Sequence, residues 1–281
     1  MNHKLTNEEL LKIENKIPKY EKYIFFEKQN KYSLLIPVIN EGERFISQMN
    51  KMKEGNIFNI CDVFICDGGS KDNSSDPEFI KEYGCRGLII NTSNKKGQGV
   101  QLKQGFYESM INSYNGSIMV DGNDKDNISE SLQLFINKLE EGYDVVQSTR
   151  FSLGGYEENT PLGRLIGIRL IASPLISITS NFHYDDVCNG YKGFSSKYIL
   201  DRRMDWFREE FNTYEYCYYP LVHVKKLGYK VCQVPTTRIY PKNEVPSKIK
   251  GLSSNFKLLK EILNLAYSKT RPDQTKKKKQ L

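Results

Sequence analysis

The sequence is poor in the residue patterns that form zinc or disulfide sites. It contains three histidines and six cysteines, and no two cysteines are spaced as C-x-x-C. A zinc centre is therefore not expected, and reduced thiols in a cytosolic protein are the simplest interpretation. The histidines are His3, His183 and His223, and the cysteines are Cys61, Cys66, Cys85, Cys188, Cys217 and Cys232.

Long uninterrupted apolar runs are also missing. The stretch from Asn2 to Glu14 is largely polar, so no signal peptide is expected there. The most apolar window, Leu162 to Phe182, is interrupted by Arg164, Arg169 and Pro174, which argues against a helix that spans a membrane. A helix that lies in the membrane interface remains compatible with this composition.

The 281-residue chain carries a formal net charge of +7. An excess of basic over acidic residues suggests anionic partners in general, such as phosphates, a lipid surface or nucleic acid. The chain has no RNP-like or helix-turn-helix signature, so nucleic acid is not expected among its partners.

Short apolar runs alternate with helical patterns from residue 32 onward. Strands are expected at 32–38, 61–66, 87–91, 118–120 and 143–148, and the intervening helices at 43–52, 74–83, 100–114 and 129–141. This alternation predicts a single α/β domain with a Rossmann-like, mostly parallel sheet flanked by helices. Later elements are a helical stretch broken at Pro174, a strand-like segment, a helix and a strand, expected at 161–180, 185–194, 214–227 and 229–234.

Composition divides the chain into four parts. Residues 1–31 are charged and carry apolar side chains at helical spacing, which predicts an N-terminal helical extension. The main domain is expected at 32–250 and an amphipathic helix at 251–268. The basic segment 269–281 is expected to be a disordered tail.

The strongest candidate site is SIMVDGNDKD, residues 117–126. Asp121 follows an apolar run, at the carboxyl end of a predicted strand, where open α/β sheets bind ligands, and Gly122 lets the backbone approach a ligand closely. Oxygen-bearing side chains in this stretch suit Mg²⁺ or Mn²⁺ shared with phosphate oxygens: Asp121, Asn123, Asp124 and Asp126. The alternative is an Asx-rich turn followed by a helix N-cap.

Six segments follow one another along the chain in an order that can be compared with known motif series: IPVINEGE (36–43), ICDGGSKDNS (65–74), NKKGQGVQLKQGF (94–106), VDGNDKD (120–126), STRF (148–151) and DVCNGYKGFS (186–195). Together they resemble the successive motifs of family 2 glycosyltransferases of the GT-A fold, and most of all the branch typified by dolichol-phosphate mannose synthase. The resemblance runs from about Ser33 to Phe194, with a looser match, EVPSK, at 244–248.

The resemblance implies a nucleotide-sugar site. Pro37 and Glu41 match the loop that walls the nucleoside, and Asp67 matches the residue that accepts a hydrogen bond from the nucleobase. Lys96 and Gly97 match a basic, glycine-containing segment near the donor. The alternatives are a turn-forming aspartate for Asp67 and a solvated basic loop for Lys96.

Asp121 matches the first carboxylate of the metal-binding D-x-D motif, and Asn123 stands in the second position. A divalent cation there would stabilise the negative charge that develops on the leaving diphosphate. Asn123 offers an amide oxygen but no charge, so weaker metal binding is expected unless Asp124 or Asp126 compensates.

Basic side chains on the acceptor side suit phosphate binding, because the guanidinium fork matches phosphate oxygens. The candidates are Arg150, Arg164, Arg169, Lys192, Arg238 and Lys248, with a surface ion pair as the alternative for each. Glu215 and Asp186 are the acidic candidates; a hydroxyl acceptor would need a general base, whereas a phosphate acceptor is already a nucleophile. The catalytic candidates are Asp121, Arg150 and Glu215.

These patterns predict a glycosyltransferase that uses a UDP- or GDP-linked sugar and Mg²⁺ or Mn²⁺. The predicted acceptor is a polyprenyl phosphate, which places the protein in the cytoplasm, peripherally at the inner face of the membrane, in cell-envelope glycan synthesis. One alternative is a glycan-extending enzyme with a hydroxyl acceptor, and another is a nucleotide-sugar-binding protein with weakened catalysis. The apolar segment at 162–182 has its own alternative, a core helix that covers the sheet.

Overall fold

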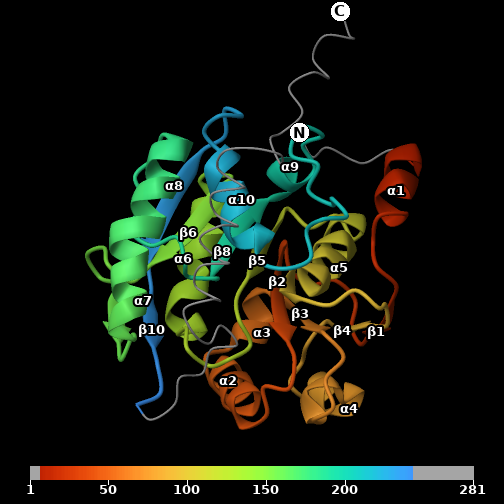
Figure 1. The fold of residues 1–281 in the computed structure, drawn as a ribbon. Coiled ribbons are helices and arrows are strands. Elements are labelled where there is room, and N and C mark those ends of the chain that lie inside the picture. Colours follow the sequence, from red (N-terminus) through yellow and green to blue (C-terminus); the bar gives the residue numbers. More distant parts are fainter. Residues whose placement is uncertain (1–6, 243–281) are drawn as a thin grey trace, which may run out of the picture.

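The computed structural model describes residues 7–242, which form one α/β domain with a sheet between two helical layers (Figure 1). Within these residues the main sheet has eight strands, in the order β1-β4-β3-β2-β5-β8-β6-β9. Their bounds are β1 Tyr20–Ile24, β2 Tyr32–Val38, β3 Asp62–Asp67, β4 Gly87–Asn91, β5 Gly116–Met119, β6 Val145–Thr149, β8 Lys192–Ser195 and β9 Val231–Pro235. A separate parallel pair joins β7 (Tyr156–Glu158) to β10 (Thr237–Ile239).

Most neighbouring strands are parallel. The pairs β4/β3, β3/β2, β2/β5 and β6/β9 are parallel, whereas β1 and β8 run antiparallel to their neighbours. Because β8 reverses direction between β5 and β6, the carboxyl ends of β2, β3, β5 and β6 lie at one edge of the sheet. All seven residues of β2 are buried, which explains its nearly continuous apolar sequence.

Helices cover both faces of the sheet. One layer packs α2 (Glu43–Glu54), α3 (Ile57–Ile60), α4 (Pro77–Glu82) and α6 (Ile128–Glu140) into a single apolar cluster. The other contains α5 (Gln98–Ile111), α8 (Ser173–Ser180), α9 (Ser196–Ile199) and α10 (Glu215–His223). In this second layer Phe106 of α5 packs against the rings of Phe194, Trp206 and Tyr216. The remaining helical segments are α1 Asn7–Glu14, η1 Asn73–Ser75, α7 Leu162–Ile166 and the π-helical η2 Gly167–Ala172.

The N-terminal segment departs from its predicted helical form. Helix α1 occupies only its first part, and Tyr20–Ile24 instead pairs antiparallel with β4 at the edge of the sheet. Pro18 cannot donate within a helix, and the free edge of β4 offers backbone partners to a segment rich in tyrosine. Lys22 of β1 also reaches Glu108 of α5 at 2.9 Å. The helical prediction is therefore wrong for this strand.

Two later elements also differ from expectation. The helix from Leu162 to Ser180 is continuous, because Pro174 falls in the first turn of α8, directly after the wide π-helical turn of η2. In the strand-like segment at 185–194, only the part from Lys192 onward is a strand. Before it, Asp186 and Asn189 accept hydrogen bonds from nearby backbone N–H groups and form turns.

The predicted helix at 251–268, the tail at 269–281 and Lys248 lie outside the described residues. The division of the chain into four parts stays a prediction.

Candidate functional site

Asp121 lies just beyond β5, at the carboxyl edge of the sheet. Its Oδ1 accepts a hydrogen bond from Gln98 Nε2 at 2.9 Å, and its Oδ2 lies 3.3 Å from Arg238 Nη2. Burial alone would raise the pKa of Asp121, but the charges of Arg238 and Lys125 together with these hydrogen bonds hold it below its ordinary value. The side chain is 22% exposed, so an anionic carboxylate is accessible from solvent.

Two glycines shape the space around this carboxylate. A Cβ added at Gly190 would lie 2.9 Å from Asp121 Oδ1, so only glycine leaves room for the carboxylate in this position. At Gly122 an added Cβ would lie 2.5 Å from Val38 Cγ1. Gly122 is thus required by packing against the end of β2, and close approach to a ligand is not needed to explain it.

Asn123 brings a second oxygen beside Asp121. Its Nδ2 lies 3.5 Å from Asp121 Oδ2, and its buried Oδ1 has no hydrogen-bond partner in the described chain. A carboxylate and an orphaned amide oxygen form a hard donor set that fits Mg²⁺ or Mn²⁺, which take their remaining ligands from phosphates and water. Residues 7–242 contain no group of three or more His, Cys, Asp or Glu side chains placed to hold a metal by themselves.

The other two acidic residues of the turn face different partners. Asp124 Oδ2 turns towards α2, where it lies 2.7 Å from Lys51 Nζ. Asp126 is buried, forms an ion pair with Arg238 Nη1 and accepts a hydrogen bond from Asn189 Nδ2 at 3.2 Å. Both carboxylates are thus engaged by protein side chains, and their compensation for Asn123 at a metal stays a prediction.

Arg238 and Tyr240 stand at the centre of a cluster of cations. The guanidinium of Arg238 lies 5.6 Å from the centre of the Tyr240 ring, and Lys125 Nζ lies 5.3 Å from it. Arg164 Nη1 donates to the Tyr240 hydroxyl at 3.4 Å. Burial would raise the pKa of Tyr240, yet Arg238, Arg150 and Arg164 lower it below its ordinary value. A positive field of this kind favours a phosphate.

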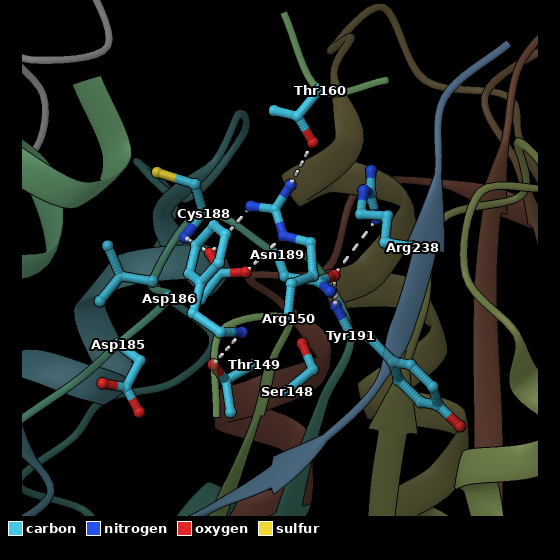
Figure 2. Close-up of polar contacts among 12 residues, drawn as sticks. Ser148, Thr149, Arg150, Thr160, Asp185, Asp186, Cys188, Asn189, Tyr191 and Arg238 are labelled. Carbon is cyan, nitrogen blue, oxygen red and sulfur yellow. Dashed lines mark hydrogen bonds and ion pairs between the residues drawn. The ribbon is translucent and has the colours of Figure 1, made fainter. Parts of the chain in front are cut away.

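Arg150 and Asp186 form a buried, two-point ion pair (Figure 2). Arg150 Nε and Nη2 donate to Asp186 Oδ2 and Oδ1 at 2.6 and 3.1 Å, and Nη1 donates to Thr160 at 3.4 Å. The two side chains are only 1% and 0% exposed. Burial lowers the pKa of Arg150, but Asp186 more than offsets this and raises it. The pair anchors the chain that leaves β6, and a contact of Arg150 with substrate stays a prediction.

Asp67 closes the turn that follows β3. Its carboxylate accepts hydrogen bonds from Gly69 N at 2.7 Å, from Ser70 N at 2.9 Å and from the Ser70 hydroxyl. The Ser70 hydroxyl in turn accepts from Asn40 N at 3.0 Å, which joins this turn to the loop after β2. The turn-forming alternative thus accounts for the contacts of Asp67, and its predicted bond to a nucleobase stays untested.

The other predicted nucleotide residues surround the same loops. Pro37 is buried within β2, and Glu41 pairs with Arg44 at 3.2 Å. Gly97 has a φ of +123°, and an added Cβ would lie 2.2 Å from the carbonyl oxygen of Asn212, so glycine is required there by backbone contact. Lys96 is exposed.

The remaining candidates are held by local contacts. Lys192 is fully buried, and its Nζ donates to Gln147 Oε1 at 2.6 Å and to the carbonyl of Asn189. Glu215 accepts hydrogen bonds from the backbone and hydroxyl of Thr213. The exposed Arg169 stacks its guanidinium 4.9 Å from the centre of the Phe151 ring. Their predicted roles at the acceptor stay untested.

Sequence reasoning missed several members of this site. Four of them lie within the quoted motifs, and their place in those motifs could have identified them as site residues: Gln98, Lys125, Asn189 and Gly190. Tyr240 lies outside those motifs, so its place beside Arg238 follows only from the fold.

The fold resembles known glycosyltransferase structures. Glucosyl-3-phosphoglycerate synthase from Mycobacterium tuberculosis, in complex with Mn²⁺, UDP and glucosyl-3-phosphoglycerate, superimposes with a TM-score of 0.57 at 14% identity, over 93% of this chain and 82% of that chain. The same enzyme with Mn²⁺, UDP-glucose and phosphoglyceric acid gives 0.57 at 12% identity, with 93% and 82% covered. The same enzyme with phosphoglyceric acid alone superimposes with a TM-score of 0.59 at 15% identity, over 93% of this chain and 84% of that chain.

No protein-family model matches the chain, and no curated protein is significantly similar to it in sequence. At this level of identity the likeness establishes the fold. The chain has the GT-A fold that its motifs predicted.

Proposed function

We propose that the protein is a metal-dependent glycosyltransferase that transfers a sugar from a UDP- or GDP-linked donor. The observation that carries this proposal is the combination, beyond β5, of the anionic Asp121, the orphaned Asn123 Oδ1 and the cations Arg238 and Lys125. A sugar diphosphate bound with a divalent cation needs both oxygen ligands and positive charge. Structural neighbours with the same fold were determined with UDP and Mn²⁺, which supports the same donor chemistry here.

Asp121 and Asn123 would hold the Mg²⁺ or Mn²⁺ ion, which when bound supplies Lewis-acid stabilisation of the leaving diphosphate. Arg238 fixes the Asp121 carboxylate and, with Lys125, adds positive charge where the diphosphate departs. In the transfer, the bond from the anomeric carbon to the diphosphate oxygen breaks and a bond to the acceptor oxygen forms. The linked loops after β2 and β3 would wall the nucleoside.

The acceptor we propose is a polyprenyl phosphate presented at a membrane surface. The helix from Leu162 to Ser180 is the one segment of the described chain long and apolar enough to cross a membrane, yet only 22% of its apolar window is buried. Its outward residues include Leu170 and Ile178, which are 72% and 78% exposed. In Figure 1 this helix runs along the left margin of the molecule. Such exposure favours an interfacial helix over the alternative of a core helix.

This apolar helix is connected to the candidate site. Arg164 of α7 donates to Tyr240, and Tyr240 lies against Arg238, which contacts Asp121. A lipid lying along the helix would therefore bring its phosphate towards the cations around Tyr240. A phosphate acceptor is already a nucleophile, so no general base is required on this route.

The donor half of the proposal is tested by thermal shift with UDP and GDP, each with and without Mn²⁺. A nucleotide that binds only the native state raises the melting temperature, and Asp121→Ala should abolish both the shift and turnover while the unliganded protein stays folded. The matched control is Glu78→Ala, which removes an exposed carboxylate of α4. Unchanged nucleotide binding in Asp121→Ala would remove Asp121 from the site.

The acceptor half is tested by offering polyprenyl phosphate in detergent and a panel of oligosaccharides to the wild type, Arg169→Ala and the control Arg202→Ala. We expect transfer to the lipid phosphate, reduced only in Arg169→Ala. The double variant Leu170→Gln/Ile178→Gln should sediment less with anionic vesicles than the wild type. Transfer to oligosaccharide hydroxyls alone, indifferent to Arg169, would overturn the lipid acceptor and leave the glycan-extending alternative.

The uncharged amide of Asn123 at the proposed metal site supports one further candidate function, that of a nucleotide-sugar-binding protein with weakened catalysis. Nucleoside diphosphate binding that requires Mn²⁺, without turnover on either class of acceptor, would establish it.

A further inference from the structure

We propose that Asn189 is a positioning residue of the candidate site, and that it makes the site selective for a diphosphate by dividing the Arg238 guanidinium between two carboxylates. This inference rests on the proposed function, because it concerns the same donor diphosphate. Asn189 lies in the turn that precedes β8 and is fully buried. It therefore acts on the diphosphate through Arg238.

The side-chain amide of Asn189 donates one hydrogen bond and accepts another. Its Nδ2 donates to Asp126 Oδ1 at 3.2 Å, and its Oδ1 accepts from Arg238 Nη1 at 3.2 Å, a contact visible in Figure 2. Because Arg238 Nη1 also forms an ion pair with Asp126 Oδ2, the three side chains close a triangle. An aspartate of the same shape could accept from Arg238 but could not donate to Asp126, so the triangle requires the amide.

The triangle directs the other terminal nitrogen of Arg238 towards Asp121. Arg238 Nη2 lies 3.3 Å from Asp121 Oδ2, and the Asp121 side chain is 22% exposed. Arg238 is only 5% exposed, so its protein partners rather than solvent decide how its charge is shared. While Nη1 is held by Asp126 and Asn189, Asp121 receives one contact from Arg238 and stays accessible to a cation. Asn189 thus sets how much of the charge of Arg238 reaches Asp121.

The turn that carries Asn189 also reaches Asp121 from the opposite side. Tyr191 N donates to Asn189 Oδ1 at 3.1 Å, which fixes the amide relative to the start of β8 (Figure 2). The next residue, Gly190, packs so closely that an added Cβ would lie 2.9 Å from Asp121 Oδ1. One turn therefore borders Asp121 directly at Oδ1 and, through Arg238, at Oδ2.

A diphosphate can use both positive charges that this geometry keeps apart. A divalent cation at Asp121 takes further oxygen ligands from phosphates, and Arg238 stands beside it as a second positive charge. A nucleoside monophosphate has one phosphate group and gains less from the second charge. If Arg238 moved wholly to Asp121 it would neutralise the metal ligand, and if it moved wholly to Asp126 it would leave the diphosphate. Either shift should cost diphosphate affinity above all.

The experiment uses isothermal titration calorimetry of the full chain with UDP, UMP, GDP and GMP, all in the presence of Mn²⁺. Asn189→Asp places a second carboxylate beside Asp126 and draws Arg238 away from Asp121. We expect the affinity for the diphosphate to fall at least tenfold and that for the monophosphate to change less than about threefold. The double variant Asn189→Asp/Asp126→Asn exchanges the charge within the same triangle and should recover most of the diphosphate affinity. The control Asn137→Asp makes the same chemical change on the exposed face of α6 and should alter neither affinity.

A second single variant keeps the test decisive if Asn189→Asp does not fold. Asp126→Asn opens the triangle from the other side and should lower the diphosphate affinity in the same way. Unchanged preference for the diphosphate in either single variant would overturn the inference and leave the proposed function standing. An equal loss of monophosphate and diphosphate binding, or a double variant that recovers nothing, would also overturn it, because Asn189 would then serve the fold alone. A wild type that binds neither UDP nor GDP would instead overturn the proposed function, and the donor role of Asn189 with it.

Discussion

The buried pair of Arg150 and Asp186 gives the sharpest prediction about how the site is held. Replacing Asp186 by Ala leaves the Arg150 guanidinium buried with its two shortest hydrogen bonds, 2.6 and 3.1 Å, unmade. Because neither side chain is more than 1% exposed, solvent cannot take over the lost contacts. Breaking a buried pair in this way costs about 3 to 5 kcal/mol, so we expect the free energy of unfolding to fall by that amount.

Urea-induced unfolding measures this loss, and the single Trp206, which is buried in the core, supplies the fluorescence signal. The double variant Arg150→Met/Asp186→Leu removes both charges and should recover most of the stability, since an apolar pair of similar volume avoids desolvating the ions. The control is Glu141→Ala, which breaks the exposed pair with Lys138 and should leave the free energy of unfolding nearly unchanged.

A loss below about 1 kcal/mol in Asp186→Ala would refute this reasoning, because the guanidinium would then have found other partners or solvent. The double variant also separates two roles of Arg150. If Arg150 only anchors the chain after β6, the double variant keeps turnover. If Arg150 touches the substrate, the double variant is stable and inactive.

Three further predictions concern single positions. Asn123→Asp adds a charged oxygen to the proposed metal site, so calorimetry should show tighter Mn²⁺-dependent nucleotide binding, and an unaltered Mn²⁺ titration would mean that Asn123 faces elsewhere. Gly190→Ala should weaken nucleotide binding at least tenfold, because its Cβ would lie 2.9 Å from Asp121 Oδ1, whereas Gly163→Ala, with nothing within 4 Å, should bind normally. Burial lowers the pKa of Lys103 from 10.5 to about 8, so the folded chain binds this proton more weakly than the unfolded chain does. At pH 7 the charged Lys103 therefore destabilises the folded chain. Lys103→Met should raise the free energy of unfolding, measured with urea at pH 7, by up to about 3 kcal/mol. That advantage should shrink as the pH rises from 8 to 10.5, and an advantage independent of pH would show that the charge of Lys103 is not its cause.

The local sequence pattern was sufficient to predict the central strands and to place Asp121 at the carboxyl edge of the sheet. Strands such as β2 are covered on both faces, so their sequences are apolar throughout, and the first polar residue after such a run marks the carboxyl edge. The pattern failed where two periodicities overlap. Apolar residues in the segment that contains β1 also fit helical spacing, and only the unpaired edge of β4 decides in favour of a strand.

The pairing of charges inside the site could not be predicted from the sequence. Arg238 lies 112 positions from Asp126 and 117 from Asp121, and no local rule connects residues so far apart. Lys192 shows a second limit: its motif predicts an acceptor-side role, which stays a prediction, but the motif gave no sign that the antiparallel strand β8 places this lysine in the middle of the sheet. Burial of this kind depends on the strand order, which the sequence pattern does not contain.

If Asp121 forms the proposed donor site, the balance of charge around it predicts that metal and donor bind together. Asp121 and Asp126 are matched by Arg238 and Lys125, and Asn123 adds an oxygen without a charge. A site with so little excess negative charge attracts a free divalent cation weakly, whereas a bound nucleoside diphosphate brings the missing negative charge and further oxygen ligands. By linkage, each ligand must then strengthen the binding of the other by the same factor. Titration of Mn²⁺ into the protein with and without UDP or GDP measures that factor, and equal Mn²⁺ affinity in the two titrations would mean that the metal is held by the protein alone.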